Sequence, residues 1–154
     1  MTKVLVVESD VVVRGYLVPL LKALGHGASG VGNAAALSRR AARRAPDAVL
    51  CDAILPDGDG IEVCRRLKIL RPALTVMIMA WDSESGVRAR QAALGPVLIK
   101  PFSPEELRDA LTLGLFSRLK ITLSRAVTDL KTQNAEIRSL INDPPDPKTR
   151  EAEE

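Results

Sequence analysis

Cysteine, aromatic residues and long apolar runs are all scarce in this chain of 154 residues. Its two cysteines, Cys51 and Cys64, fall in a predicted strand and a predicted helix, where we expect free thiols and no disulfide, metal or redox motif. Aromatic residues make up 3% of the chain, so stacking platforms for single-stranded nucleic acid are nearly absent. No apolar run approaches the roughly 18 residues that a membrane span needs. These shortages exclude a disulfide scaffold and a membrane-spanning protein.

The composition that remains is that of a folded α/β domain. Apolar residues make up 46% of the chain, enough for a full core without structural metal. The N-terminus enters a strand pattern at once, without signal-peptide architecture, so we expect a cytoplasmic protein. The net charge of +3 is mild, and four arginines between Arg39 and Arg44 are interpreted as a solvated helix face. Nucleic-acid binding is therefore not expected.

Strand-like and helix-like segments alternate along the first part of the chain. Asp10 and Asn33 are typical N-caps, and Pro104 suits the first turn of a helix. The expected strands cover 3–8, 27–31, 48–52, 75–80 and 97–100, and the expected helices cover 10–24, 33–44, 60–70, 83–94 and the residues from 104. Five βα units in series predict a doubly wound, five-stranded parallel sheet with helices on both faces.

Three charged residues stand where apolar strands end. Asp52 follows the run 48–51, Glu8 follows Val4–Val7, and Lys100 follows Val97–Ile99. Ligands and chemistry in open α/β sheets gather outside the carboxyl ends of the strands. We therefore expect two acids and a lysine in one polar pocket that suits a cation and a phosphoryl group.

Three motifs carry a resemblance to a known family. They are Val4-Leu5-Val6-Val7-Glu8, then Leu50-Cys51-Asp52-Ala53-Ile54-Leu55-Pro56-Asp57-Gly58-Asp59-Gly60, then Ile99-Lys100-Pro101-Phe102. Together they resemble the receiver domain of two-component response regulators, from about residue 3 to about residue 115. The resemblance implies a flavodoxin-like fold with strand order 2-1-3-4-5.

The resemblance also implies the role of each residue. Asp52 would accept a phosphoryl group from a sensor histidine kinase or a phosphotransfer protein. Asp52, Glu8 and the backbone carbonyl of Ile54 would hold Mg²⁺, whose preferred ligands are hard oxygens. Lys100 would pair with the phosphoryl oxygens, and the Lys100–Pro101 peptide bond would be cis. Asp57 and Asp59 are interpreted as turn formers.

Three positions depart from the pattern of the family. Ser9 stands where a second acid usually ligates the metal, so Mg²⁺ binding should be weak, with Ser9 or Asp10 as the further ligand. Ala80 replaces the hydroxyl residue that reports phosphorylation, and Val97 replaces the aromatic residue that moves with it. Beside Ala80, Trp81 is interpreted either as a cover for the site or as a packing residue.

The helical pattern continues beyond the region of resemblance. Residues with alternating spacings of three and four form a heptad core, which comprises Phe116, Leu119, Leu123, Ala126, Leu130, Gln133, Ile137 and Leu140. Because a lone helix would leave this stripe in water, we expect a homodimer through the helix Phe116–Leu140. The predicted organisation is a receiver domain at 1–115, a helical extension at 116–141 and a disordered tail at 142–154, with no output domain.

Two functions remain open from the sequence. The first is a stand-alone response regulator that is phosphorylated on Asp52 and signals through protein contacts. The second is a pseudo-receiver, which would serve as a dimerisation or scaffold module without phosphorylation, as Ser9, Ala80 and Val97 would allow. An independent enzyme is not expected, because no histidine, cysteine or serine nucleophile stands at a strand end with a base.

Overall fold

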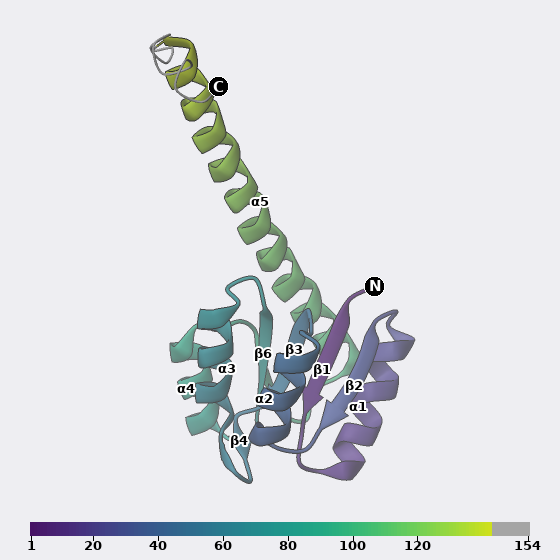
Figure 1. The fold of residues 1–154 in the computed structure, drawn as a ribbon. Coiled ribbons are helices and arrows are strands. Elements are labelled where there is room, and N and C mark those ends of the chain that lie inside the picture. The colour runs from purple at the N-terminus through teal and green to yellow at the C-terminus, as the bar shows by residue number, and fades with distance from the viewer. Residues whose placement is uncertain (143–154) are drawn as a thin grey trace. The chain divides into compact units, whose positions relative to one another are not determined.

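The computed structural model describes residues 1–142 and contains the predicted parallel sheet (Figure 1). Its strands are β1 (Lys3–Val7), β2 (Gly27–Val31), β3 (Ala48–Asp52), β6 (Thr75–Ala80) and β7 (Val97–Ile99). They pair in parallel in the order β2-β1-β3-β6-β7, which confirms the predicted order when these five strands are numbered in sequence. The glycine-rich β2 lies at an edge of the sheet, where a strand has a neighbour on one side only and needs fewer large side chains to pack.

The helices begin and end close to the expected positions. They are α1 (Val11–Ala23), α2 (Ala34–Arg43), α3 (Gly60–Leu70), α4 (Ser83–Ala92) and α5 (Pro104–Asn142). The side chains of Asp10 and Asn33 cap α1 and α2, as predicted. Helix α4 ends two residues earlier than expected, because Ala93 adopts a left-handed backbone conformation with φ of 51°.

Two apolar clusters lie on the two faces of the sheet, because neighbouring residues of a strand point to opposite sides. One cluster joins Leu5, Val49 and Val76 to α2, α3 and α4, and the other joins Val4, Leu50 and Met77 to α1 and the start of α5. β3 and β6 are buried along their whole length, as central parallel strands must be. The strand ends, and the side chains that follow them, are therefore firmly placed.

A short antiparallel hairpin follows β3, where the sequence predicted only a turn. It consists of β4 (Ile54–Leu55) and β5 (Gly58–Asp59). Gly60 comes next, and a Cβ atom at this position would lie 1.9 Å from the carbonyl oxygen of Asp52. Only glycine permits this close approach of α3 to the end of β3.

The chain divides into two compact units, Met1–Leu119 and a second unit that begins at Lys120. The described part of the second unit, to Asn142, belongs to α5. Its side chains are exposed apart from the half-buried Ile121, which leaves the apolar heptad positions in water. Except for Asn142, the predicted disordered tail lies outside the described residues. No helix within residues 1–142 has the length and hydropathy of a membrane span.

Candidate functional site

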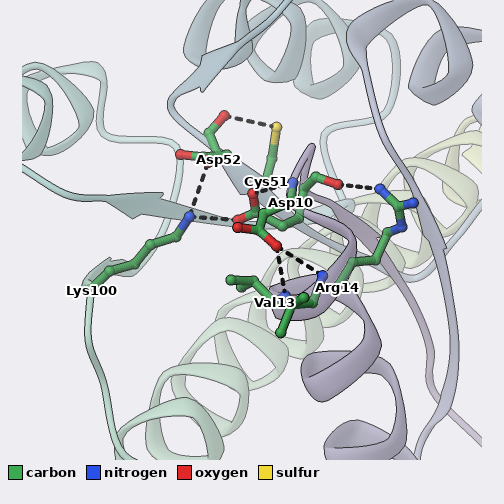
Figure 2. Close-up of polar contacts among 8 residues, drawn as sticks. Asp10, Val13, Arg14, Cys51, Asp52 and Lys100 are labelled. Carbon is green, nitrogen blue, oxygen red and sulfur yellow. Dashed lines mark hydrogen bonds and ion pairs between the residues drawn. The ribbon is translucent and has the colours of Figure 1, made fainter.

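Glu8, Asp52 and Lys100 meet at the carboxyl ends of β1, β3 and β7. Figure 2 shows Lys100 reaching towards Asp52. Lys100 Nζ donates to Glu8 Oε2 at 2.5 Å and to Asp52 Oδ2 at 2.9 Å. The three residues are only 2%, 7% and 6% exposed, respectively. We refer to Glu8, Asp52 and Lys100 as the acidic–lysine cluster.

The strand register explains why three residues so distant in sequence come together. β1 and β3 are neighbours, with Val7 opposite Cys51, so Glu8 and Asp52 leave the sheet side by side. Ile99 of β7 lies opposite Ala80 of β6, and the Lys100 amide donates to the Ala80 carbonyl at 2.8 Å. The predicted polar pocket therefore follows from parallel strands that end at one edge.

The cluster carries one uncompensated negative charge when both carboxyl groups are ionised. Burial raises the pKa of the Asp52 carboxyl above its ordinary value, and the nearby Glu8 charge raises it further. The hydrogen bond and the positive charge of Lys100 oppose this rise. Lys100, with a smaller contribution from the backbone amide of Ile54, thus favours ionised Asp52, the form that can act as a nucleophile.

Trp81 lies over the lysine of the cluster. The Lys100 ammonium is 5.1 Å from the centre of the Trp81 ring, within the range of a cation–π contact. The Trp81 residue is 62% exposed, so of the two interpretations left open by the sequence the contact favours a cover for the site. The Lys100–Pro101 peptide bond is cis, as the resemblance implied.

Ser9 and Asp10, the candidate metal ligands next to Glu8, do not join the acidic–lysine cluster. The Asp10 carboxylate accepts from the backbone amides of Val12 and Val13 at 2.8 and 3.2 Å, and Figure 2 shows it turned to the first turn of α1. Ser9 is exposed. Among residues 1–142 no group of three or more histidine, cysteine or acidic side chains is placed to hold a metal ion. Glu8 and Asp52 are thus one acid short of such a group.

The remaining predicted positions lie on three other strand segments, β4, β6 and β7. Ile54, whose carbonyl is a candidate ligand, lies in β4 with an exposed side chain. Ala80 is buried at the end of β6. Val97 lies in β7 opposite Ile78 and is half-buried. Neither Ala80 nor Val97 brings a hydroxyl or an aromatic ring to the cluster.

Contacts of the β4–β5 hairpin were missed by the sequence analysis. The Asp57 carboxylate accepts from the amides of Ala34 and Ala35 at 2.7 and 3.0 Å, so it caps α2 across 23 residues of sequence. The Asp59 carboxylate caps α3 and pairs with Arg88 of α4. The amides of Ala34 and Ala35 hold the pKa of the Asp57 carboxyl below its ordinary value. For Asp59, desolvation raises the pKa, but Arg88 and the amides at the start of α3 outweigh it and hold the pKa below the ordinary value. The Asp-Gly-Asp-Gly run indicated turns but neither these caps nor the distant partners.

Comparison with known proteins identifies the class. The profile of the response regulator receiver domain matches residues 4–112. The chain therefore belongs to this family, whose members are signalling domains of two-component systems.

Several curated proteins are similar in sequence. KdpE, the KDP operon transcriptional regulatory protein of Escherichia coli K12, is 36% identical over 119 residues, which are 75% of this chain and 52% of KdpE. NtrC of Azospirillum brasilense, a DNA-binding transcriptional regulator, is 32% identical over 116 residues, or 74% of this chain and 24% of NtrC. PdtaR of Mycobacterium tuberculosis is 29% identical over 143 residues, or 90% of this chain and 69% of PdtaR. The chain thus spans only about a quarter to a half of NtrC and KdpE.

Solved structures agree on the fold. A receiver domain protein from Clostridium thermocellum superposes with a TM-score of 0.71 at 18% identity, covering 79% of this chain and 99% of that protein. NtrX from Brucella abortus, crystallised with ADP, reaches a TM-score of 0.73 at 25% identity, covering 88% of this chain and 30% of NtrX. The first of these supports the receiver fold alone, because its sequence identity is low.

Proposed function

We propose that this protein is a response regulator that receives a phosphoryl group on Asp52 and passes the signal on through protein–protein contacts. The family implies a histidine kinase or a phosphotransfer protein as the donor. The observation that carries the proposal is the acidic–lysine cluster at the carboxyl ends of the strands, in a chain of this family. We place the protein in the cytoplasm.

The arrangement of the cluster fits phosphoryl transfer. An Asp52 carboxylate oxygen would attack the phosphorus of a phosphohistidine, forming an O–P bond. The P–N bond would break, and its electron pair would stay on the imidazole nitrogen. Lys100 would balance charge on the phosphoryl oxygens, since its ammonium already contacts Asp52. No separate base is needed, because the ionised carboxylate carries no proton to remove.

Mg²⁺ is the cofactor that the family implies, and the residues fit a weak site. Two buried carboxylates, Glu8 and Asp52, and the Ile54 carbonyl offer the hard oxygens that Mg²⁺ prefers. When bound, the ion would neutralise charge on the phosphoryl oxygens. Weak binding follows from the neutral oxygen of Ser9 and from Lys100, which already pairs with both carboxylates.

We further propose that the protein is a homodimer through the helix Phe116–Leu140. The large apolar heptad side chains Phe116, Leu119, Leu123, Leu130, Ile137 and Leu140 are all exposed in the isolated chain. Pairing of two such helices would bury them, and Gln133 as the polar core position would set the register.

The test is labelling by a small phosphodonor. The wild-type protein should take up one phosphoryl group from acetyl phosphate in the presence of Mg²⁺, and Asp52→Asn should take up none. Asp57→Asn is the matched control, because Asp57 lies on the hairpin outside the cluster and an asparagine can still cap α2. Labelling of Asp52→Asn at the wild-type level would refute the assignment.

The alternative, a phosphorylation-independent dimerisation or scaffold module, makes the opposite prediction. Neither acetyl phosphate nor a histidine kinase would then label the folded dimer under any Mg²⁺ concentration. The substitutions at Ser9, Ala80 and Val97 are compatible with this alternative, but the comparisons do not favour it over the response regulator.

A further inference from the structure

A groove lies between the C-terminal halves of α2 and α3, two helices that pack side by side (Figure 1). Its volume is about 290 Å³. Small residues of α2 form one wall and apolar residues of α3 form the other; the lining comprises Ser38, Ala41, Ala42, Val63, Arg66, Leu67, Leu70 and Arg71. None of these residues belongs to the acidic–lysine cluster.

The small side chains of α2 explain why the groove is open. Ser38 and Ala42 reach only a short way towards α3, so the apolar side chains opposite are not covered. Leu70 remains 76% exposed, and its neighbour Ile69 is also exposed. The groove therefore offers apolar surface that binding could remove from water.

Arg71 brings an unsatisfied donor to the end of this groove. Among residues 1–142, its Nη1 atom is the buried side-chain nitrogen or oxygen that has no hydrogen-bond partner. Buried polar groups are nearly always paired, and a guanidinium is best satisfied by a carboxylate. Arg71 as a whole is only half-buried and lines the groove, so its guanidinium can turn towards an occupant that supplies the acceptor Nη1 lacks.

The charged side chains that line the groove are of one sign, because Arg66 and Arg71 belong to the lining and no acid does. Glu62 on α3 is already paired with Arg65 and Arg66. An acidic occupant is favoured here, whereas a second copy of the same face would bring like charges together.

We propose that the α2–α3 groove docks an acidic, amphipathic segment of a partner protein, with apolar side chains in the groove and a carboxylate on Arg71. The apolar lining favours a protein over nucleic acid, whose affinity would come from phosphate contacts and whose bases would need stacking partners. The inference deepens the proposed signalling through protein contacts by naming a surface and the chemistry of its partner. It does not depend on phosphorylation of Asp52.

The probe is a fluorescein-labelled helical peptide with leucines at i, i+3, i+4 and i+7 and glutamates on the remaining positions. Its binding to the full chain is followed by fluorescence anisotropy. We expect micromolar affinity that weakens roughly tenfold in Arg71→Met, because a charge-assisted hydrogen bond to a buried group is lost. Ala42→Leu, which fills the groove with a good helix former, should weaken binding at least as much.

Controls separate the groove from general attraction. Arg43→Met removes an exposed arginine of α2 that does not line the groove, and it should change the affinity less than about twofold. A peptide with lysine in place of glutamate should not bind. Asp52→Asn should bind the acidic peptide like the wild type, so a failure of the phosphoacceptor assignment would not be confused with a failure of the groove.

Three results would overturn the proposal. The first is that Ala42→Leu binds the acidic peptide as tightly as the wild type does. This result can be obtained even if Arg71→Met does not fold. The second is equal weakening by Arg43→Met and Arg71→Met. The third is tighter binding of a labelled DNA duplex than of the peptide at the same salt concentration, which would make the face a nucleic-acid site.

Discussion

Replacement of Lys100 by methionine tests whether the acidic–lysine cluster is held together by one buried ammonium. Methionine keeps much of the length and apolar volume of the lysine side chain while removing its charge. In the wild type the ammonium contacts Glu8 and Asp52 at 2.5 and 2.9 Å, and each of the three residues is less than a tenth exposed. Lys100→Met would leave two buried carboxylates without a cation.

The structure sets the size of the effect. At an effective dielectric constant of about 20, unit charges about 2.7 Å apart attract each other by roughly 6 kcal/mol, most of which is offset by desolvation. Removal of one partner keeps the desolvation cost and loses the attraction. We expect the free energy of unfolding at neutral pH to fall by about 3–5 kcal/mol, the usual loss for a broken buried ion pair.

The loss should depend on pH in a defined direction. Burial already raises the pKa of the Asp52 carboxyl, and Lys100 is the main group that opposes this rise, so its removal raises the pKa further. A carboxyl group with a higher pKa in the folded state contributes stability below its unfolded pKa and loses that contribution as pH rises through the folded value. The deficit of Lys100→Met should therefore grow from mildly acidic to neutral pH.

Urea unfolding at fixed protein concentration measures these differences. The double variant Asp52→Asn/Lys100→Met should be more stable at neutral pH than Lys100→Met, because only Glu8 then remains unpaired. If Lys100→Met is too unstable at neutral pH to give a folded baseline, a measurable folded baseline for the double variant still tests the buried ion pair. A loss below about 1 kcal/mol in Lys100→Met, with the pH dependence of the wild type, would refute the buried ion pair.

Three further predictions concern the metal, the assembly and the close packing at the acceptor. Ser9→Asp should tighten Mg²⁺ binding in a calorimetric titration, since it adds an anionic oxygen; an unchanged affinity would mean that another acid already fills this place. Leu123→Glu with Leu130→Glu should convert the dimer into a folded monomer in sedimentation velocity, while a wild-type monomer at tens of micromolar would contradict the dimer. Gly60→Ala places a Cβ atom 1.9 Å from the carbonyl oxygen of Asp52, so it should abolish acetyl phosphate labelling and lower the free energy of unfolding by more than about 2 kcal/mol. Gly58→Ala, whose Cβ meets nothing within 4 Å, is the control and should be labelled normally.

The fold and the centre of the site were predictable because both depend on local patterns. Apolar runs of the right length predicted four of the five strands, the exception being the glycine-rich β2, and Asp10 and Asn33 predicted two helix starts. Once the strands are parallel, the residues that follow them must share one edge of the sheet. The proximity of Glu8, Asp52 and Lys100 could therefore be predicted without knowing how the side chains pack.

The contacts that the sequence did not predict depend on how loops fold back over the sheet. Nothing in the order of residues indicates that Asp57 meets the amides of α2 or that Asp59 meets Arg88. The burial of the Arg71 Nη1 atom likewise depends on how the end of α3 packs. For Asp57 and Asp59 a short-range pattern identified polar residues in a turn, while their partners were set by tertiary geometry.

The residues around the acceptor bear on how a phosphoryl group on Asp52 would be sensed. A ligand shifts a conformational equilibrium only through interactions that differ between the two states. Ala80 offers a buried methyl group in place of a hydroxyl, so it cannot form a hydrogen bond that exists only in the phosphorylated state. Trp81 and Ile54, in contrast, are exposed apolar side chains beside the cluster, and Trp81 already contacts the lysine that would bind the phosphoryl group. This arrangement favours phosphorylation-dependent contacts at the rim of the site over repacking of a distant face, whereas the α2–α3 groove would bind its partner in either state.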